Sequence, residues 1–177
     1  MTPKLNSKNY IIRAFKYSDL QTFADYRARP EVAQFQSWSS YVLEDAISLF
    51  ENIDYKNFAV AGNWYQLAIT DIQTDNILGD LAVYFIDDQQ VEIGFTIAPE
   101  FQKQGIAFEA INCLLTYLFT ELKIHRIIAI TDANNTASYK LLEKIRFRKE
   151  AHFIQNVFFK GVWGDEFQYA LLSTEFK

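Results

Sequence analysis

The sequence has very little cysteine, glycine and proline. Its 177 residues include Cys 1, Gly 6 and Pro 3. The single cysteine, Cys113, cannot form an intramolecular disulfide or a cysteine-based zinc site, so we expect a reducing compartment, the cytoplasm. The two histidines, His125 and His152, lack metal-ligand spacing, and we expect no bound metal. The scarcity of glycine and proline excludes collagen-like and low-complexity chains.

Long apolar runs and an excess of basic residues are absent as well. No run approaches about 18 uninterrupted apolar residues, so no transmembrane helix is predicted. The first ten residues lack the apolar core of a signal peptide. Lys+Arg 17 against Asp+Glu 22 gives a net charge of −5. We therefore expect neither a nucleic-acid nor a membrane partner, and the acidity favours small cationic partners.

The composition is typical of a globular protein. Apolar residues make up 50% and charged residues 22% of the chain, and its length predicts one domain over residues 1–177. Aromatic residues are abundant at 16%, with Phe 16 and Tyr 10. We expect the aromatic residues near the C-terminus, Phe158 to Tyr169, to lie mostly in the core, while exposed aromatic residues would permit a homodimer.

Periodicity and turn residues predict an α+β protein. Helices are expected at 20–27, 42–53, 105–122 and 135–144, and strands at 10–14, 65–70, 77–86, 91–97, 126–131, 147–158 and 166–172. Short polar links between the strands of 65–97 predict antiparallel pairing. The strand, helix and strand of 91–131 require a parallel crossover. We expect a mixed, twisted sheet, antiparallel early and parallel at the central crossover, flanked by helices.

One segment joins a predicted strand to the longest predicted helix and favours phosphate binding. It reads Gln102-Lys103-Gln104-Gly105-Ile106-Ala107. Gly105 removes side-chain bulk, and the first turn of the helix presents unpaired N–H groups with the positive end of the helix dipole. Lys103 could add a charged contact. The alternative is that Gly105 only begins the helix. The fingerprints of P-loop and dinucleotide-binding proteins are absent.

Two further segments carry candidate catalytic groups. Along Val91-Glu92-Ile93-Gly94-Phe95-Thr96-Ile97, the alternation of side chains places Glu92 beside the gap at Gly94, where a carboxylate could act as a general base. The alternative is a solvent-facing glutamate. In the segment that follows strand 126–131, Asn134 or Asn135 is a natural N-cap, and Ser138 or Tyr139 could protonate a leaving group.

In this order the three segments resemble the GNAT superfamily of acyl-CoA-dependent N-acyltransferases. Residues 102–107 are similar to its phosphate-binding pattern [QR]-x-x-G-x-[GA], and 91–99 to its signature strand. The run from Asn135 to Ser138, continued to Phe147, is similar to its N-x-x-S…L-E-K-x-G-F segment. The opening Ile12-Arg13-Ala14-Phe15 and the closing Gly161-Val162-Trp163-Gly164-Asp165 resemble the ribosomal-protein-alanine N-acetyltransferases.

The resemblance implies an acetyl-CoA-dependent N-acetyltransferase in which a primary amine attacks the thioester directly. Glu92 would be the base, and Ser138 or Tyr139 the acid. The acceptor would be a protein or peptide N-terminus. The alternatives are a small cationic amine, such as a polyamine or aminoglycoside, or a non-catalytic acyl-CoA-binding module. The implied coenzyme A contacts are Phe95, Thr96, Ile97, Gln102, Lys103, Gln104, Gly105, Ile106, Ala107, Phe108, Asn135, Ser138 and Lys144.

Two residues depart from the family pattern. Arg146 stands where the family usually has glycine after a helix, which predicts local strain if that position needs a positive φ. Phe108 stands where a small hydroxyl residue often follows the phosphate loop, and this removes one hydrogen bond near the pyrophosphate.

Overall fold

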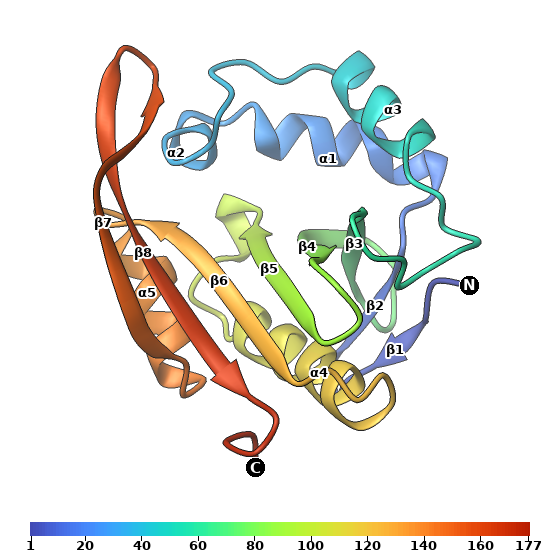
Figure 1. Ribbon diagram of the computed structural model, residues 1–177. Coiled ribbons are helices and arrows are strands. Elements are labelled where there is room, and N and C mark those ends of the chain that lie inside the picture. Colours follow the sequence, from blue (N-terminus) through green and yellow to red (C-terminus); the bar gives the residue numbers. More distant parts are fainter.

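The computed structural model describes residues 1–177, which fold around one mixed sheet (Figure 1). The eight strands lie in the order β1-β2-β3-β4-β5-β6-β8-β7. Their bounds are β1 Leu5–Asn6, β2 Tyr10–Ala14, β3 Trp64–Asp71, β4 Ile77–Phe85, β5 Gln90–Ile97, β6 Arg126–Asp132, β7 Arg148–Phe159 and β8 Val162–Leu172. All neighbouring strands pair antiparallel except β5 and β6, which are parallel. The predicted mixed sheet is confirmed.

Helices lie on both sides of the sheet. Their bounds are α1 Leu20–Arg27, α2 Pro30–Ala33, α3 Leu43–Glu51, α4 Ile106–Thr120 and α5 Thr136–Lys144, with short 3₁₀ turns at Tyr17–Asp19 and Pro99–Phe101. In Figure 1, α1, α2 and α3 run above the sheet, whereas α4 and α5 lie on its other side. No helix is long and apolar enough to cross a membrane.

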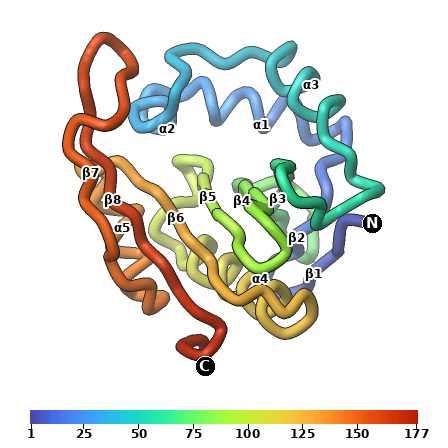
Figure 2. The backbone as a smooth tube through the Cα atoms, in the orientation of Figure 1, coloured from blue at the N-terminus to red at the C-terminus, as the bar shows by residue number.

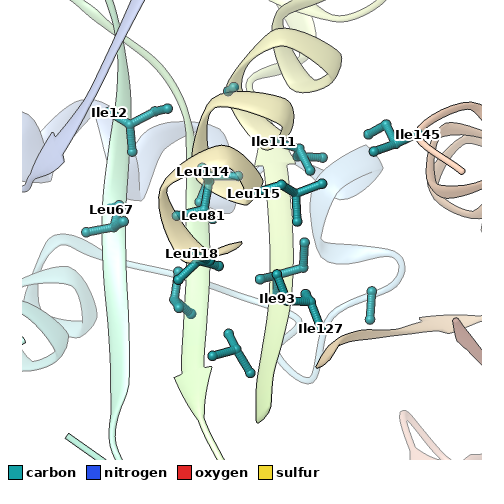
Figure 3. Packing of buried hydrophobic residues seen from close by; sticks show 14 of the residues in the cluster. Ile12, Leu67, Leu81, Ile93, Ile111, Leu114, Leu115, Leu118, Ile127 and Ile145 are labelled. Carbon is teal, nitrogen blue, oxygen red and sulfur yellow. The ribbon is translucent and has the colours of Figure 1, made fainter. Parts of the chain in front are cut away.

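The main core forms between α4 and the sheet (Figure 3). The apolar face of α4 contributes Ile111, Leu114, Leu115 and Leu118, each fully buried. They pack against alternate residues of neighbouring strands, which are Ile12, Leu67, Leu81, Ile93 and Ile127. A strand shows every second residue to one face, whereas a helix shows every third or fourth. The sequence follows both periods, so the burial of α4 fixes its N-terminus relative to β5.

A second, smaller core forms beneath α1 and α3. Phe23 of α1 packs edge-to-face on Phe15 with 4.7 Å between ring centroids, and both belong to a cluster with Ala46 of α3 and Ala68 of β3. A bidentate ion pair from Arg13 to Asp19 ties β2 to the start of α1, with N–O distances of 2.7 and 3.1 Å. This region holds α1 over the sheet, next to the site described below.

The predicted elements are confirmed with small shifts at their ends. The structure adds the short strand β1 and the short helix α2, which the sequence analysis did not predict. Pro30 follows the end of α1 and begins α2, because proline suits the first helical position. The last hairpin is longer than predicted. Its turn is Lys160-Gly161, and residues 162–164 already belong to β8.

The prediction that the C-terminal aromatic residues lie mostly in the core is wrong for the hairpin tip. Tyr169 is fully buried, but Phe158 and Trp163 are 57% and 59% exposed. The tip extends past the end of the neighbouring strand β6, as the tube in Figure 2 shows, so no layer covers these rings. Their only aromatic contact is with each other, at 5.2 Å between centroids.

Arg146 provides a test of backbone strain. The residue has a φ of 76°, is exposed, and its side chain makes no hydrogen bond. A non-glycine residue in this left-handed region costs roughly 1–2 kcal/mol. We expect Arg146→Gly to raise the free energy of unfolding by about 1 kcal/mol in urea titrations, because the relief of strain exceeds the added unfolded-state entropy. Arg146→Ala, which keeps the strain, should give no gain. An equal gain in both variants would contradict this explanation.

Candidate active site

The site begins where the two parallel strands separate. The pairing of β5 with β6 extends only from Gln90↔Arg126 to Glu92↔Ile128. Beyond this point β5 stays paired with β4 as far as Ile97, and β6 stays paired with β8 as far as Asp132. Each strand therefore keeps its outer partner while the inner edges diverge. The inner edge of β5 after Glu92 has backbone groups without a strand partner, and a ligand can pair with them.

A cavity of about 480 Å³ lies at this divergence. All residues predicted to contact coenzyme A line it, except Gln104. These residues are Phe95, Thr96, Ile97, Gln102, Lys103, Gly105, Ile106, Ala107, Phe108, Asn135, Ser138 and Lys144. The side chain of Gln104 instead donates to the carbonyl of Glu100 at 3.2 Å. The volume is typical of a site for a small molecule or cofactor.

The segment from Gln102 to Ala107 forms a loop with an open helix start. Gly105 has a φ of 84°, and a Cβ added there would meet nothing within 4 Å. No side chain caps α4, so the N–H groups of its first turn, from Ile106 to Phe108, have no partner. Gln102 fixes the loop to β5 by donating to the carbonyl of Ile97 at 3.0 Å. This arrangement suits an anion such as phosphate.

Lys144 and Phe108 lie together at the wall of this cavity. The Nζ atom of Lys144 lies 4.9 Å from the centroid of the Phe108 ring, and Phe108 is 37% exposed. The ammonium group therefore faces the same cavity as the free N–H groups of α4. Together they make this wall electropositive, although the whole chain carries −5.

A smaller cavity of about 200 Å³ adjoins the first. The two share six lining residues, Phe35, Gln36, Phe95, Thr96, Asn135 and Ser138. Four charged residues line only the smaller cavity, Arg27, Asp80, Asp132 and Glu166. Because the cavities share one wall, a group carried in the larger cavity can meet a molecule bound in the smaller one.

The three predicted catalytic residues occupy different places relative to these cavities. Ser138 lines both, and its N–H is capped by the Asn135 carboxamide oxygen at 3.2 Å. Tyr139 lines neither and packs on Phe167, with 5.6 Å between ring centroids. Glu92 is half-buried and lines neither cavity, but it lies two residues before Gly94, on the same face of β5.

The environment of Glu92 favours its protonated form. Burial raises the pKa of Glu92 above its ordinary value, and the negative charge of Glu166 raises it further. A carboxylate with a raised pKa is a stronger base once it is ionised. The raised pKa suits the base role that the sequence analysis predicts for Glu92, and that role stays a prediction.

The sequence analysis did not identify several residues that line the two cavities. Phe35 and Gln36 come from the loop after α2, where no periodicity or motif identifies them. Arg27 and Asp80 are separated by 53 residues and meet only through the packing of α1 on β4. Glu166 is the first residue of a predicted strand, and that position alone does not indicate a functional role.

The comparison with protein families identifies residues 9–148 as an acetyltransferase (GNAT) domain. The chain belongs to the GNAT acetyltransferase family. It is an N-acyltransferase with acetyl-CoA as its donor. The unpaired N–H groups of α4 and the neighbouring cavity fit the phosphates and the arm of this cofactor.

Individual GNAT relatives differ in the acceptors that their names give. The chain is 30% identical to the uncharacterised N-acetyltransferase YnaD of Bacillus subtilis, over 97% of this chain and 98% of that one. It is 26% identical to a spermidine N(1)-acetyltransferase of Vibrio cholerae, over 77% and 81%. It is 30% identical to the Escherichia coli [ribosomal protein uS5]-alanine N-acetyltransferase, over 47% and 43%.

A solved structure confirms the fold. A GNAT-family acetyltransferase from Bacillus anthracis superposes with a TM-score of 0.87 at 27% identity, covering 98% of this chain and all of that one. The relatives include acetyltransferases of both a polyamine and a ribosomal protein, so the family does not determine the acceptor.

Proposed function

We propose that this enzyme acts in the cytoplasm and transfers the acetyl group of acetyl-CoA to the α-amine of a protein or peptide N-terminus. The observation that carries the proposal is the meeting of two unlike cavities at Thr96, Asn135 and Ser138. The larger cavity ends at the N-terminus of α4, where the helix dipole is positive. The smaller one carries the carboxylates of Asp132 and Glu166 and suits an amine.

In this proposal, coenzyme A is held by backbone groups of two elements. Its pyrophosphate accepts hydrogen bonds from the N–H groups of residues 104–108, where the helix dipole adds to the attraction. Its pantetheine arm lies along Phe95 to Ile97, on the edge of β5 that β6 leaves unpaired. Lys144 and Lys103 add charge beside the phosphates, and Asn135 lies near the thioester.

The reaction is a direct transfer. The neutral amine attacks the thioester carbonyl carbon, the C–N bond forms, and the C–S bond breaks as the tetrahedral intermediate collapses. Glu92 generates the neutral amine by accepting a proton from the acceptor ammonium through a water molecule, because Glu92 itself lines neither cavity. Ser138 protonates the departing thiolate. Tyr139 would need to leave its contact with Phe167 to replace Ser138 in this role.

Two observations support an N-terminal acceptor. An α-amino group has a pKa of about 7.7–8.0, against about 10.4 for lysine, so more of it is neutral at pH 7 and able to attack. The segments 12–15 and 161–165 resemble ribosomal-protein-alanine N-acetyltransferases, and relatives from Escherichia coli and Shigella flexneri carry that name. The competing candidate is a small polyamine, favoured by the acidic lining of the smaller cavity and by the spermidine-acetylating relative.

The coenzyme A placement predicts the effect of a substitution at Gly105. We expect Gly105→Val to weaken coenzyme A binding strongly in calorimetry, because the side chain would occupy the space of the pyrophosphate. Gly62→Val is the matched control. Gly62 has nearly the same φ, 81° against 84°, and equally open surroundings, but it lies outside both cavities. Unchanged affinity in Gly105→Val, or an equal loss in both variants, would refute the placement.

The role of Glu92 predicts opposite changes in activity and stability. We expect Glu92→Gln to lower the rate by about 10²- to 10⁴-fold near pH 7, and by less at alkaline pH, where the amine is already neutral. The raised pKa means that ionised Glu92 destabilises the folded state. This penalty is absent below the unfolded pKa of about 4.3 and develops as pH rises through the folded pKa.

Glu92→Gln should therefore be more stable than wild type at pH 7 and equally stable at pH 3. Urea titrations at the two pH values, beside rate measurements, separate this outcome from misfolding. Glu121→Gln, at the exposed end of α4, should change neither the rate nor the stability. A Glu92→Gln enzyme with wild-type activity at pH 7 would remove Glu92 from the mechanism.

The acceptor class is tested by competition. N-terminal peptides, polyamines and aminoglycosides are offered to the enzyme at equal concentration, and kcat/KM is measured from thiol release. We expect peptides to be the best acceptors. A far higher kcat/KM for polyamines or aminoglycosides would show the preference for N-termini to be wrong, while the acetyltransferase activity itself would stand.

A further inference from the structure

Arg27 lines the smaller cavity with most of its hydrogen-bonding capacity unused. It is the last residue of α1, and 9% of its side chain is exposed. A guanidinium has five N–H donors, but its single hydrogen bond here runs from Nη2 to Asp80 Oδ2 at 3.2 Å. Its Nε is the one buried side-chain nitrogen or oxygen in the protein without a partner. Nη1 also makes no hydrogen bond, and unlike Nε it is not fully buried, so a ligand in the cavity can reach it. An under-used guanidinium at a cavity wall points to a ligand that supplies an acceptor.

The guanidinium is held in place by aromatic rings. Its central carbon lies 4.3 Å from the ring centroid of Phe23, 4.6 Å from that of Trp38 and 5.3 Å from that of Tyr41. The indole N–H of Trp38 donates to the carbonyl of Arg27 at 3.1 Å. Arg27 is therefore a preorganised group whose orientation does not depend on the ligand.

Asp80 compensates the charge of Arg27 without occupying its other donors. Its side chain is 1% exposed and accepts hydrogen bonds from the Tyr26 hydroxyl and the Gln66 carboxamide as well as from Arg27. The pair offers N–H donors with little net charge. Such a site suits a neutral carbonyl oxygen, whereas a free carboxylate would also meet the negative charge of Asp80.

The smaller cavity also carries acceptors. Asp132 and Glu166 line it together with Arg27, and they suit an ammonium group. A matching ligand carries an amine for these carboxylates and a carbonyl for Arg27, close enough together to share this cavity of about 200 Å³. A polyamine has no oxygen and would bring a second cation towards Arg27.

We propose that Arg27 is a specificity-determining residue, which binds the carbonyl oxygen next to the reacting amine of the acceptor. The proposal rests on the proposed function and deepens it, because it names the group that distinguishes a peptide N-terminus from a simple amine. It assigns Arg27 to recognition of the acceptor and gives it no part in coenzyme A binding, since it does not line the larger cavity.

The test compares two small acceptors of matched shape. L-Alaninamide has the amine and the neighbouring carbonyl, and 3-methylbutan-2-amine has the same skeleton without the carbonyl. The measured quantity is the ratio of their kcat/KM values, corrected for the neutral fraction of each amine. This ratio does not depend on how much of the enzyme is folded. We expect wild type to prefer L-alaninamide and Arg27→Met to lower the ratio by about 10- to 100-fold, the loss typical of a charged hydrogen bond.

A second variant covers the case in which Arg27→Met fails to fold because Asp80 is left unpaired. Arg27→Met combined with Asp80→Asn removes both charges. The carboxamide introduced by the second change can accept from Gln66 through its oxygen and donate to the Tyr26 hydroxyl through its nitrogen. We expect this double variant to lose the preference for L-alaninamide, whereas Asp80→Asn alone should keep it. Coenzyme A affinity, measured by calorimetry, should be unchanged in all variants.

The outcomes separate this inference from the proposed function. A wild-type ratio retained in Arg27→Met or in the double variant would overturn the role of Arg27. A higher kcat/KM for polyamines than for peptides in the competition experiment would contradict the proposal of an N-terminal acceptor. If the ratio still collapsed in that case, Arg27 would be confirmed as a carbonyl-recognising residue for a different amide-bearing amine.

Discussion

The structure depends on the limited pairing of two parallel strands. β5 and β6 share only the register from Gln90 to Glu92, because each then follows its antiparallel partner on the other side. If β5 and β6 stayed paired along their whole length, there would be no gap between them and neither strand would have a free edge. The separation creates the two cavities, and it places the end of β5, the start of α4 and the start of α5 around them. The chemistry of the site therefore follows from a property of the sheet.

The separation would be unstable without the packing on either side. On one face, α4 buries its apolar side in the main core, which holds Gly105 and the free N–H groups at the end of the gap. On the other face, Arg13 bonds both Asp19 and Asp75, at 2.7 and 2.9 Å, and links β2, the start of α1 and the turn before β4. This second anchor holds α1, and with it Arg27, over the smaller cavity.

Local signals in the sequence predicted the elements well, and they also identified residues that line the larger cavity. The apolar stripe of α4, the alternation in β5 and the glycine before the helix are each written in a few consecutive residues. Most of the residues predicted to contact coenzyme A share those segments, which explains why all but Gln104 line the larger cavity. The resemblance to the family added roles that periodicity alone left open for Glu92 and Ser138.

The residues that line the smaller cavity could not be predicted in the same way. Arg27, Asp80 and Glu166 come from α1, β4 and β8, and their proximity exists only after the sheet has formed. Phe35 and Gln36 lie in the loop that leads to Trp38, and Trp38 contacts Arg27 only in the folded chain. The prediction that Phe158 and Trp163 lie in the core was wrong. The burial of a ring depends on which elements cover it, and the hydrophobicity of the residue does not predict that.

Two features of the site oppose folding, and both relate to the acceptor. Glu92 is held where burial and Glu166 disfavour its charge, and Arg27 keeps a buried Nε without a partner. Neither feature stabilises the protein alone. In the function that we propose, a peptide N-terminus would bring a proton for Glu92 to receive and an oxygen for the accessible Nη1 of Arg27 to bind. Energetic cost concentrated at a site is expected where the residues are selected for function and not for stability.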